Sequence, residues 1–267
     1  MIPKEAQSAA SAQSWSLQSQ VAFVPGGYGG LGSAICRGLA AAGALPIVAG
    51  RDAGKAEALV QELRAAGHAA DSAQLDATDV GAIRSTVDAA AQRHGRIDLL
   101  VNCVGIQHEE PMLDVSEDAF DEVVSANLKS AMFLAQACAR HQIAGGRGGA
   151  QVHLLSVRSQ LGLRGRGYSA YCATKGALVM LVRQHASELA PHGIRVNGVA
   201  PTVIDTELAS HWLKNETTRR QITERIPLGR VGQPEDVVGP VLFFCAPAAA
   251  FVTGQVLYVD GGVTASQ

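Results

Sequence analysis

Short apolar runs alternate along this chain with longer segments in which apolar residues recur with helical periodicity. The short runs predict strands at residues 21–24, 45–49, 73–75, 97–101, 151–155, 193–199 and 255–259. The longer segments predict helices at residues 31–42, 53–66, 118–140, 168–190 and 234–244. Alternating strands and helices form parallel sheets covered on both faces. We therefore predict an α/β fold, a doubly wound (Rossmann) sheet of about seven parallel strands.

The composition favours one large domain over residues 17–267, because 47% of the 267 residues are hydrophobic and can fill a sizeable core. Residues 1–16 are rich in Ala, Ser and Gln, which predicts a disordered tail and not a secretion signal. No apolar run reaches the about 20 residues of a membrane-spanning helix, so we expect no membrane partner. The net charge of -2 favours no nucleic-acid partner.

The cysteines form no CxxC pair, and their number is odd: Cys36, Cys103, Cys138, Cys172 and Cys245. This usage favours a reduced cytoplasmic protein in which the thiols are small buried groups. The chain shows no metal-ligand spacing, so we expect no metal site.

Tyr171 and Lys175 are the most informative pair of polar residues. Residues at i and i+4 share one helix face, so the two side chains are expected to lie close together. A phenol titrates near pH ~10, and a neighbouring cation favours its ionised form. We therefore expect Lys175 to lower the pKa of Tyr171 toward neutral pH, where general acid–base catalysis works best.

A glycine-rich turn follows the first predicted strand and precedes a helix. It reads Gly26-Gly-Tyr-Gly-Gly30-Leu31-Gly32. Glycines let the backbone approach a pyrophosphate closely, and a helix N-terminus favours its negative charge. In this position the turn indicates a dinucleotide site.

Together, Gly26-x3-Gly30-x-Gly32 and Tyr171-x3-Lys175 resemble the short-chain dehydrogenase/reductase family, over roughly residues 17–262. Further matches follow in the family's order: Asp76, Asn102-Cys-Val-Gly105, Asn127, Ser156, Arg195-Val-Asn197, Pro201 and Asp260-Gly-Gly262. The resemblance implies a single dinucleotide-binding and catalytic domain that interconverts a secondary alcohol and a ketone. It also implies a homotetramer.

The resemblance also implies catalytic roles. Tyr171 exchanges a proton with the substrate oxygen, while Lys175 lowers the tyrosine pKa and holds the nicotinamide ribose. Ser156 hydrogen-bonds the substrate carbonyl, and Asn127 holds a water that links Lys175 to solvent. The family usually spaces its serine and tyrosine thirteen apart, whereas here Ser156 is fifteen and Ser159 twelve before Tyr171. We expect Ser156 because it directly follows the fifth predicted strand, with Ser159 as the alternative.

Other residues are expected to contact the cofactor through the same resemblance. Leu31 belongs to the glycine turn, and Asp76 lies beside the adenine unless it is only a turn residue. Asn102 and Gly105 run along the cofactor, although Cys103 and Val104 depart from the family's Asn-Asn-Ala-Gly motif. The nicotinamide end is expected at Pro201, Thr202 and Thr206.

The end of the second strand bears on the choice between NAD and NADP. Gly50 stands where NAD-type members carry an aspartate, and Arg51 stands where NADP-type members place a basic group. A guanidinium can bind a 2′-phosphate by two hydrogen bonds. We therefore favour NADP(H) over NAD(H); the alternative is that Arg51 stacks on the adenine or pairs with Asp52.

The substrate is expected to be a small polar molecule. The Gly105-Ile-Gln107-His108 run resembles gluconate 5-dehydrogenase-like members of the family, and Arg158 could meet a carboxylate. Trp212 is expected in a lid, either over the substrate or against a neighbouring helix. We predict an oxidoreductase for a sugar acid or polyol. The alternatives are a 3-oxoacyl-carrier-protein reductase and a catalytically silent dinucleotide-binding module.

Overall fold

Seven strands of the described chain form one parallel sheet. The structure, a computed structural model, describes residues 14–266, so most of the tail predicted at residues 1–16 lies outside the described residues. The strands are β1 (Val21–Pro25), β2 (Leu45–Gly50), β3 (Asp71–Gln74), β4 (Leu99–Asn102), β5 (Gly149–Leu154), β6 (Ile194–Pro201) and β7 (Val256–Val259). Their order is β3-β2-β1-β4-β5-β6-β7, and every neighbouring pair is parallel. The predicted doubly wound fold is therefore confirmed.

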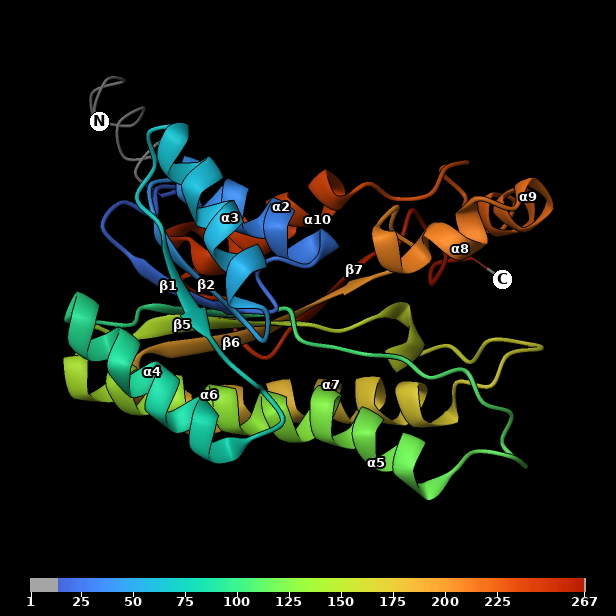
Figure 1. The fold of residues 1–267 in the computed structure, drawn as a ribbon, viewed down its shortest axis with the longest axis horizontal. Helices are drawn as coiled ribbons and strands as arrows, with labels where there is room; N and C mark the ends of the chain where they lie inside the picture. Colours follow the sequence, from blue (N-terminus) through green and yellow to red (C-terminus); the bar gives the residue numbers. More distant parts are fainter. Residues whose placement is uncertain (1–13, 267) are drawn as a thin grey trace.

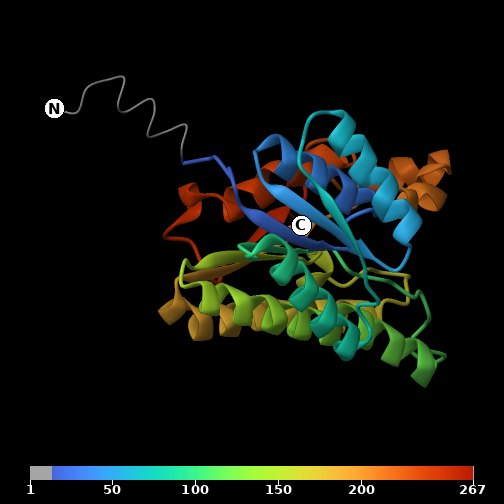
Figure 2. The ribbon, with the colours of Figure 1, turned by 60° about the vertical axis from the view of Figure 1, so that its left-hand side comes forward.

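Helices cover both faces of the sheet (Figure 1). One layer contains α2 (Gly30–Ala41), α3 (Ala53–Ala65) and α10 (Pro234–Cys245). The opposite layer contains α4 (Val80–His94), α5 (Glu117–Val124), α6 (Ser130–Gly145) and α7 (Ser169–Leu189). The same two layers are visible in the turned view of Figure 2. Within residues 14–266, no helix has the length and apolar content to span a bilayer.

Alternating side chains of the central strands fill two separate cores. On β1, Ala22 and Val24 pack with the α2, α3 and α10 layer. Val21 and Phe23 point the other way and pack with α4 and α6. Successive side chains of a strand point to opposite faces, so a strand covered on both sides is mostly apolar, although β5 and β6 also bury Gln151, His153 and Asn197. This requirement explains why the strongest apolar runs in the sequence are the central strands.

Two elements between the second and fourth strands differ from the prediction. Helix α4 was not expected, because its buried stripe holds only two large apolar residues, Ile83 and Val87, before Ala90 and Ala91. The third strand spans Asp71–Gln74 and not residues 73–75. It is an edge strand with no fully buried side chain, so its sequence carries little apolar signal.

The helix predicted at residues 118–140 has three parts. Helix α5 passes into a π-helical turn, η1 (Ser125–Lys129), and then into α6. π-helical turns are rare and occur frequently at functional sites. Two short helices, α8 (Ser210–Leu213) and α9 (Glu216–Thr223), lie in the region expected to form a lid (Figure 1). The 3-10 turns are η2 (Val157–Ser159), η3 (Ala190–His192), η4 (Glu207–Ala209) and η5 (Pro247–Ala249).

Candidate active site

The predicted functional residues follow the carboxyl ends of four neighbouring strands. The glycine turn follows β1, Asn102 ends β4, Ser156 comes just after β5, and Pro201 ends β6. Helix α7 runs along the same region and carries Tyr171 and Lys175. In open α/β sheets, ligands bind outside the carboxyl ends of the strands, so this edge is the candidate active site.

Ser156 is the serine that the fold brings to Tyr171. It is buried at the start of η2, and its side chain hydrogen-bonds with Tyr171. The backbone N–H of Arg158 donates to Ser156 Oγ at 3.1 Å, which fixes the serine side chain. Ser159 instead pairs with the hydroxyl of Tyr258 on β7 at 3.1 Å. Of the two candidate serines, Ser156 has the geometry for chemistry at Tyr171.

The structure raises the pKa of Tyr171, whereas the sequence analysis expected it to be lowered. Burial is the largest influence and raises the pKa of Tyr171, and the hydrogen bond with Ser156 and the charge of Arg158 oppose it only in part. A buried phenol is harder to ionise because the phenolate loses its hydration. At neutral pH Tyr171 is therefore protonated, the form that can donate a proton.

Lys175 lies beside Tyr171 with its ammonium group buried. Its Nζ is 5.6 Å from the centroid of the Tyr171 ring and donates to the Leu154 carbonyl at 2.8 Å. Burial lowers the pKa of Lys175 to about 8. A Cβ added at Gly105 would lie 3.4 Å from Nζ, so the loop after β4 passes close to the amine.

Asn127 sits in the π-helical turn and fixes that same loop. Its Oδ1 accepts from the Ile106 N–H at 2.8 Å, and its Nδ2 donates to the Ile106 carbonyl at 2.9 Å. Nδ2 also lies 3.2 Å from Oγ1 of Thr174, one residue before Lys175. The Asn127 side chain therefore joins the loop after β4 to helix α7.

The glycine turn has the shape of a cradle for a dinucleotide diphosphate. Gly26 has a φ of +74°, and a Cβ there would lie 2.8 Å from the Cys103 backbone. A Cβ at Gly30 would lie 2.8 Å from the Thr206 side chain, and one at Gly32 would overlap the Gly26 carbonyl. Because side chains are excluded, the backbone at the start of α2 can approach a phosphate directly. These residues fit a nicotinamide dinucleotide.

The remaining predicted cofactor residues lie at or just after the carboxyl ends of other strands, or in the first turn of α2. Asp76 accepts hydrogen bonds from Thr78, which hold the pKa of Asp76 below its usual range, and the charge of Arg51 also acts on it. Asn102 accepts from the Val104 N–H at 3.1 Å, so it shapes the loop after β4. Leu31 lies in the first turn of α2, and Thr202 follows β6 with its N–H bonded to β7.

The four predicted substrate residues lie on three different segments, with Gln107 and His108 on the loop after β4. Arg158 lies near Tyr171, and its NH1 donates to the carbonyls of Leu161 and Gly162. His108 pairs with Glu122 of α5 at 2.7 Å. Gln107 is half-buried in the same loop. Trp212, on α8, packs against an apolar cluster that includes Leu213, Ile226 and Val231.

A three-residue cluster that the sequence analysis missed holds two active-site loops together. The Tyr168 hydroxyl donates to Glu109 at 3.1 Å, and Arg166 forms an ion pair with the same carboxylate at 2.8 Å. The Glu110 N–H donates to the Gly167 carbonyl at 2.9 Å. The Tyr168 ring lies 6.1 Å from the Tyr171 ring. The sequence could have indicated Tyr168, because it lies three residues before Tyr171 and residues at i and i+3 share a helix face.

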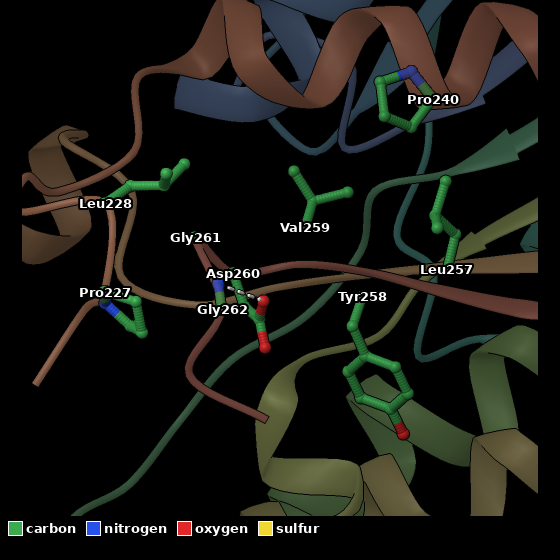
Figure 3. Close-up of a pocket in the computed structure, with 9 residues that line it drawn as sticks. All are labelled: Pro227, Leu228, Pro240, Leu257, Tyr258, Val259, Asp260, Gly261 and Gly262. Carbon is green, nitrogen blue, oxygen red and sulfur yellow. Dashed lines mark hydrogen bonds between the residues drawn. The ribbon is translucent and has the colours of Figure 1, made fainter. Parts of the chain in front are cut away.

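An open apolar depression of about 510 Å³ lies away from these groups (Figure 3). Its lining includes Leu228, Pro240 and Leu257, and does not include Ser156, Tyr171 or Lys175. Tyr258 points away from Pro240 in this view, toward the side of Ser159. Within the described residues, no group of three or more His, Cys, Asp or Glu could hold a metal ion.

Comparisons with known proteins agree with this arrangement. A family model described as Enoyl-(Acyl carrier protein) reductase matches residues 27–264. The chain is 37% identical to gluconate 5-dehydrogenase of Gluconobacter oxydans, over 94% of this chain and 97% of that protein. It is 36% identical to L-rhamnose 1-dehydrogenase (NAD(P)(+)) of Azotobacter vinelandii, over 92% and 97%. The crystal structure of a gluconate 5-dehydrogenase from Burkholderia cenocepacia in complex with NADP and tartrate aligns with a TM-score of 0.92 at 35% identity, over 96% of this chain and 100% of that chain.

The buried ammonium of Lys175 predicts a rise in stability with pH. The folded-state pKa of about 8 lies below the ordinary value of 10.5, so between these values the unfolded chain binds more protons. Relative to Lys175→Met, the wild-type free energy of unfolding should increase by roughly 3 kcal/mol as pH rises through this window. Urea unfolding at several pH values measures this difference.

The matched change Lys129→Met removes an exposed lysine and should show no such trend. A flat difference for Lys175→Met would contradict the burial of the charge.

Proposed function

The chain belongs to the short-chain dehydrogenase/reductase family, and we propose that it interconverts a secondary alcohol and a ketone on a small sugar acid, with NADP(H) as the preferred cofactor. It is an NAD(P)-dependent oxidoreductase acting on CH–OH groups. The observation that carries the proposed site is the hydrogen-bonded pair of Ser156 and Tyr171, with the Lys175 ammonium beside the phenol ring. These groups lie at the same sheet edge as the glycine cradle.

Gly26, Gly30 and Gly32 would hold the dinucleotide, whose nicotinamide would supply or accept the hydride. In ketone reduction, the Tyr171 hydroxyl donates its proton to the substrate oxygen, and the raised pKa of Tyr171 keeps that proton in place at neutral pH. Ser156 donates a hydrogen bond to the same oxygen and stabilises its growing negative charge. In alcohol oxidation the proton moves in the opposite direction. Lys175 is the neighbouring proton carrier, and Asn127 holds the loop that passes over it.

The charges around Tyr171 support a substrate that bears a carboxylate. Burial lowers the pKa of Arg158, and the charge of the exposed Arg225 acts in the same direction, whereas the Arg158 charge itself acts on Tyr171. NH1 of Arg158 is bonded to two carbonyls, whereas a guanidinium has five N–H donors in all. Tartrate, named in the complex of the solved gluconate 5-dehydrogenase, is also a hydroxy acid.

The preference for NADP(H) is supported by Gly50 and Arg51. An acidic side chain at the end of β2 would bind the ribose hydroxyls, and Gly50 provides none. Arg51 is exposed beside Asp76, where its charge can meet a phosphate. Asp52 accepts from the Lys55 N–H at 3.0 Å as the N-cap of α3, so its carboxylate is already engaged.

We also propose that residues 17–267 form one domain that assembles as a homotetramer in the cytoplasm. Met132, Ile143 and Met180 are exposed on the outer side of α6 and α7, and Leu228 and Leu257 line the apolar depression of Figure 3. These surfaces suit contacts with further copies of the chain. All five cysteines lie in the described part of the chain as free thiols, which suits a reducing compartment.

Replacing Tyr171 with Phe should lower kcat by at least about a hundredfold, because it removes the proton donor while keeping the ring. NADPH binding, measured by fluorescence titration, should change little. Turnover is followed by the absorbance of the reduced nicotinamide with 5-keto-gluconate, cyclic ketones and an acetoacetyl thioester. Ser156→Ala should also lose turnover, and the matched change Ser159→Ala should retain it. Retained turnover in Tyr171→Phe would contradict the mechanism, and a preference for the thioester would contradict the sugar-acid substrate.

Replacing Arg158 with Ala should raise KM for gluconate by about tenfold or more, because a charged hydrogen bond to the carboxylate is lost. KM for the neutral polyol sorbitol should stay nearly constant, and this comparison separates charge recognition from loop damage. Arg164→Ala is the matched control, since Arg164 is an exposed arginine of the same loop. Equal increases for gluconate and sorbitol would show that Arg158 only supports the loop.

A further inference from the structure

The ring of Tyr28, in the middle of the glycine turn, lies across the end of β2 at Gly50. A Cβ added at Gly50 would lie 2.9 Å from Tyr28 Cζ and 3.0 Å from its hydroxyl oxygen, and it would overlap Cε1. The backbone of Gly50 is in the ordinary β conformation of a strand and does not have a positive φ. Space, and not backbone strain, therefore disfavours a side chain at position 50 while the Tyr28 ring stays in place.

Several contacts hold the Tyr28 ring over Gly50. The Tyr28 hydroxyl accepts a hydrogen bond from the Asp52 N–H at 2.9 Å. The N–H groups of Gly26 and Gly27 both donate to the Ala49 carbonyl, at 2.8 and 3.3 Å, and join the glycine turn to β2. The ring also packs against the apolar core on this face of the sheet. A side chain at position 50 would have to displace the ring and break the bond to Asp52.

This ring fills the space in which a ribose-binding carboxylate would stand. Such a carboxylate projects from the end of the second strand in NAD-type dinucleotide folds. In the bond to Asp52 the Tyr28 hydroxyl is the acceptor, so its own proton is left for another acceptor. The exposed Arg51 comes directly after Gly50 in the chain. Its backbone carbonyl accepts a hydrogen bond from Gln74 Nε2 at 3.2 Å, which fixes the backbone at Arg51.

We propose that Tyr28 determines cofactor choice in this chain. Its ring excludes an acidic side chain at position 50, and its hydroxyl acts with Arg51 to bind the 2′-phosphate of NADP(H). The binding role rests on the proposed preference for NADP(H), whereas the exclusion by the ring does not depend on it.

The binding role is tested without turnover, by calorimetric titration with 2′,5′-ADP and 5′-AMP, which differ by the phosphate in question. Tyr28→Phe keeps the ring and should weaken 2′,5′-ADP binding about tenfold while leaving 5′-AMP unchanged, because one hydrogen bond to a charged group is lost. Arg51→Ala should show a loss at least as large. Arg84→Ala, on the opposite helical layer, should change neither affinity. Unchanged binding of 2′,5′-ADP to Tyr28→Phe would overturn the binding role.

The exclusion is tested by combining Gly50→Asp with Tyr28→Ser. Gly50→Asp alone should weaken 5′-AMP binding, because the ring must move. In the Tyr28→Ser background, the same change should strengthen 5′-AMP binding about tenfold, because the carboxylate can then reach the ribose hydroxyls. An equal gain in both backgrounds would overturn the exclusion. Gly50→Ala, a smaller intrusion, should also weaken binding only when Tyr28 is present, and thermal unfolding verifies that each variant is folded.

The affinities of the wild-type protein for 2′,5′-ADP and 5′-AMP distinguish a failure of this inference from a failure of the proposed function. Equal affinity for 2′,5′-ADP and 5′-AMP would overturn both the NADP(H) preference and the binding role of the Tyr28 hydroxyl. The dependence of Gly50→Asp on Tyr28 would still decide whether the ring excludes an acidic residue.

Discussion

The active site depends on one buried ammonium group. Lys175 is buried in α7, and its Nζ donates to the carbonyl of Leu154, the last residue of β5. A buried amine must find an acceptor, and this one binds the long helix to the carboxyl end of a central strand. Ser156 follows that strand by two residues, and Tyr171 precedes Lys175 by one helical turn. The hydrogen bond of Lys175 therefore joins the strand that leads to Ser156 and the helix that carries Tyr171.

The sequence predicted the fold wherever the elements carry strong apolar signals. β1 is buried along its whole length, and its run of apolar residues is evident from the sequence alone. The edge strand β3 contains no large apolar residue, and helix α4 buries mostly small ones, so both were misplaced or missed. The π-helical turn at Asn127 was not visible in the sequence, since one extra residue in a turn leaves the apolar pattern almost unchanged.

Spacing predicted that Tyr171 and Lys175 lie together, but it did not predict their electrostatics. The i, i+4 relation correctly placed Lys175 beside the ring of Tyr171. The direction of the Tyr171 pKa shift depends on how far the phenol is removed from water, and burial outweighs the favourable contacts. The depth of burial follows from the whole packing of the sheet, helix and loops. A pair of residue positions therefore cannot specify it.

The proposed cofactor side and the proposed substrate side of the site are held by different kinds of contact. The proposed cofactor half is formed largely by backbone at close approach, as at Gly26 and Gly32, where an added side chain would collide with neighbouring backbone atoms. The substrate half is held by side chains on loops, through the contacts of Glu109 with Arg166 and Tyr168. Loops tolerate insertions and substitutions far better than close backbone contacts do. The loops on the proposed substrate side can therefore accept changes that the backbone contacts of the glycine turn cannot. At Gly30 and Gly50 the limiting neighbour is instead a side chain, that of Thr206 and of Tyr28 respectively.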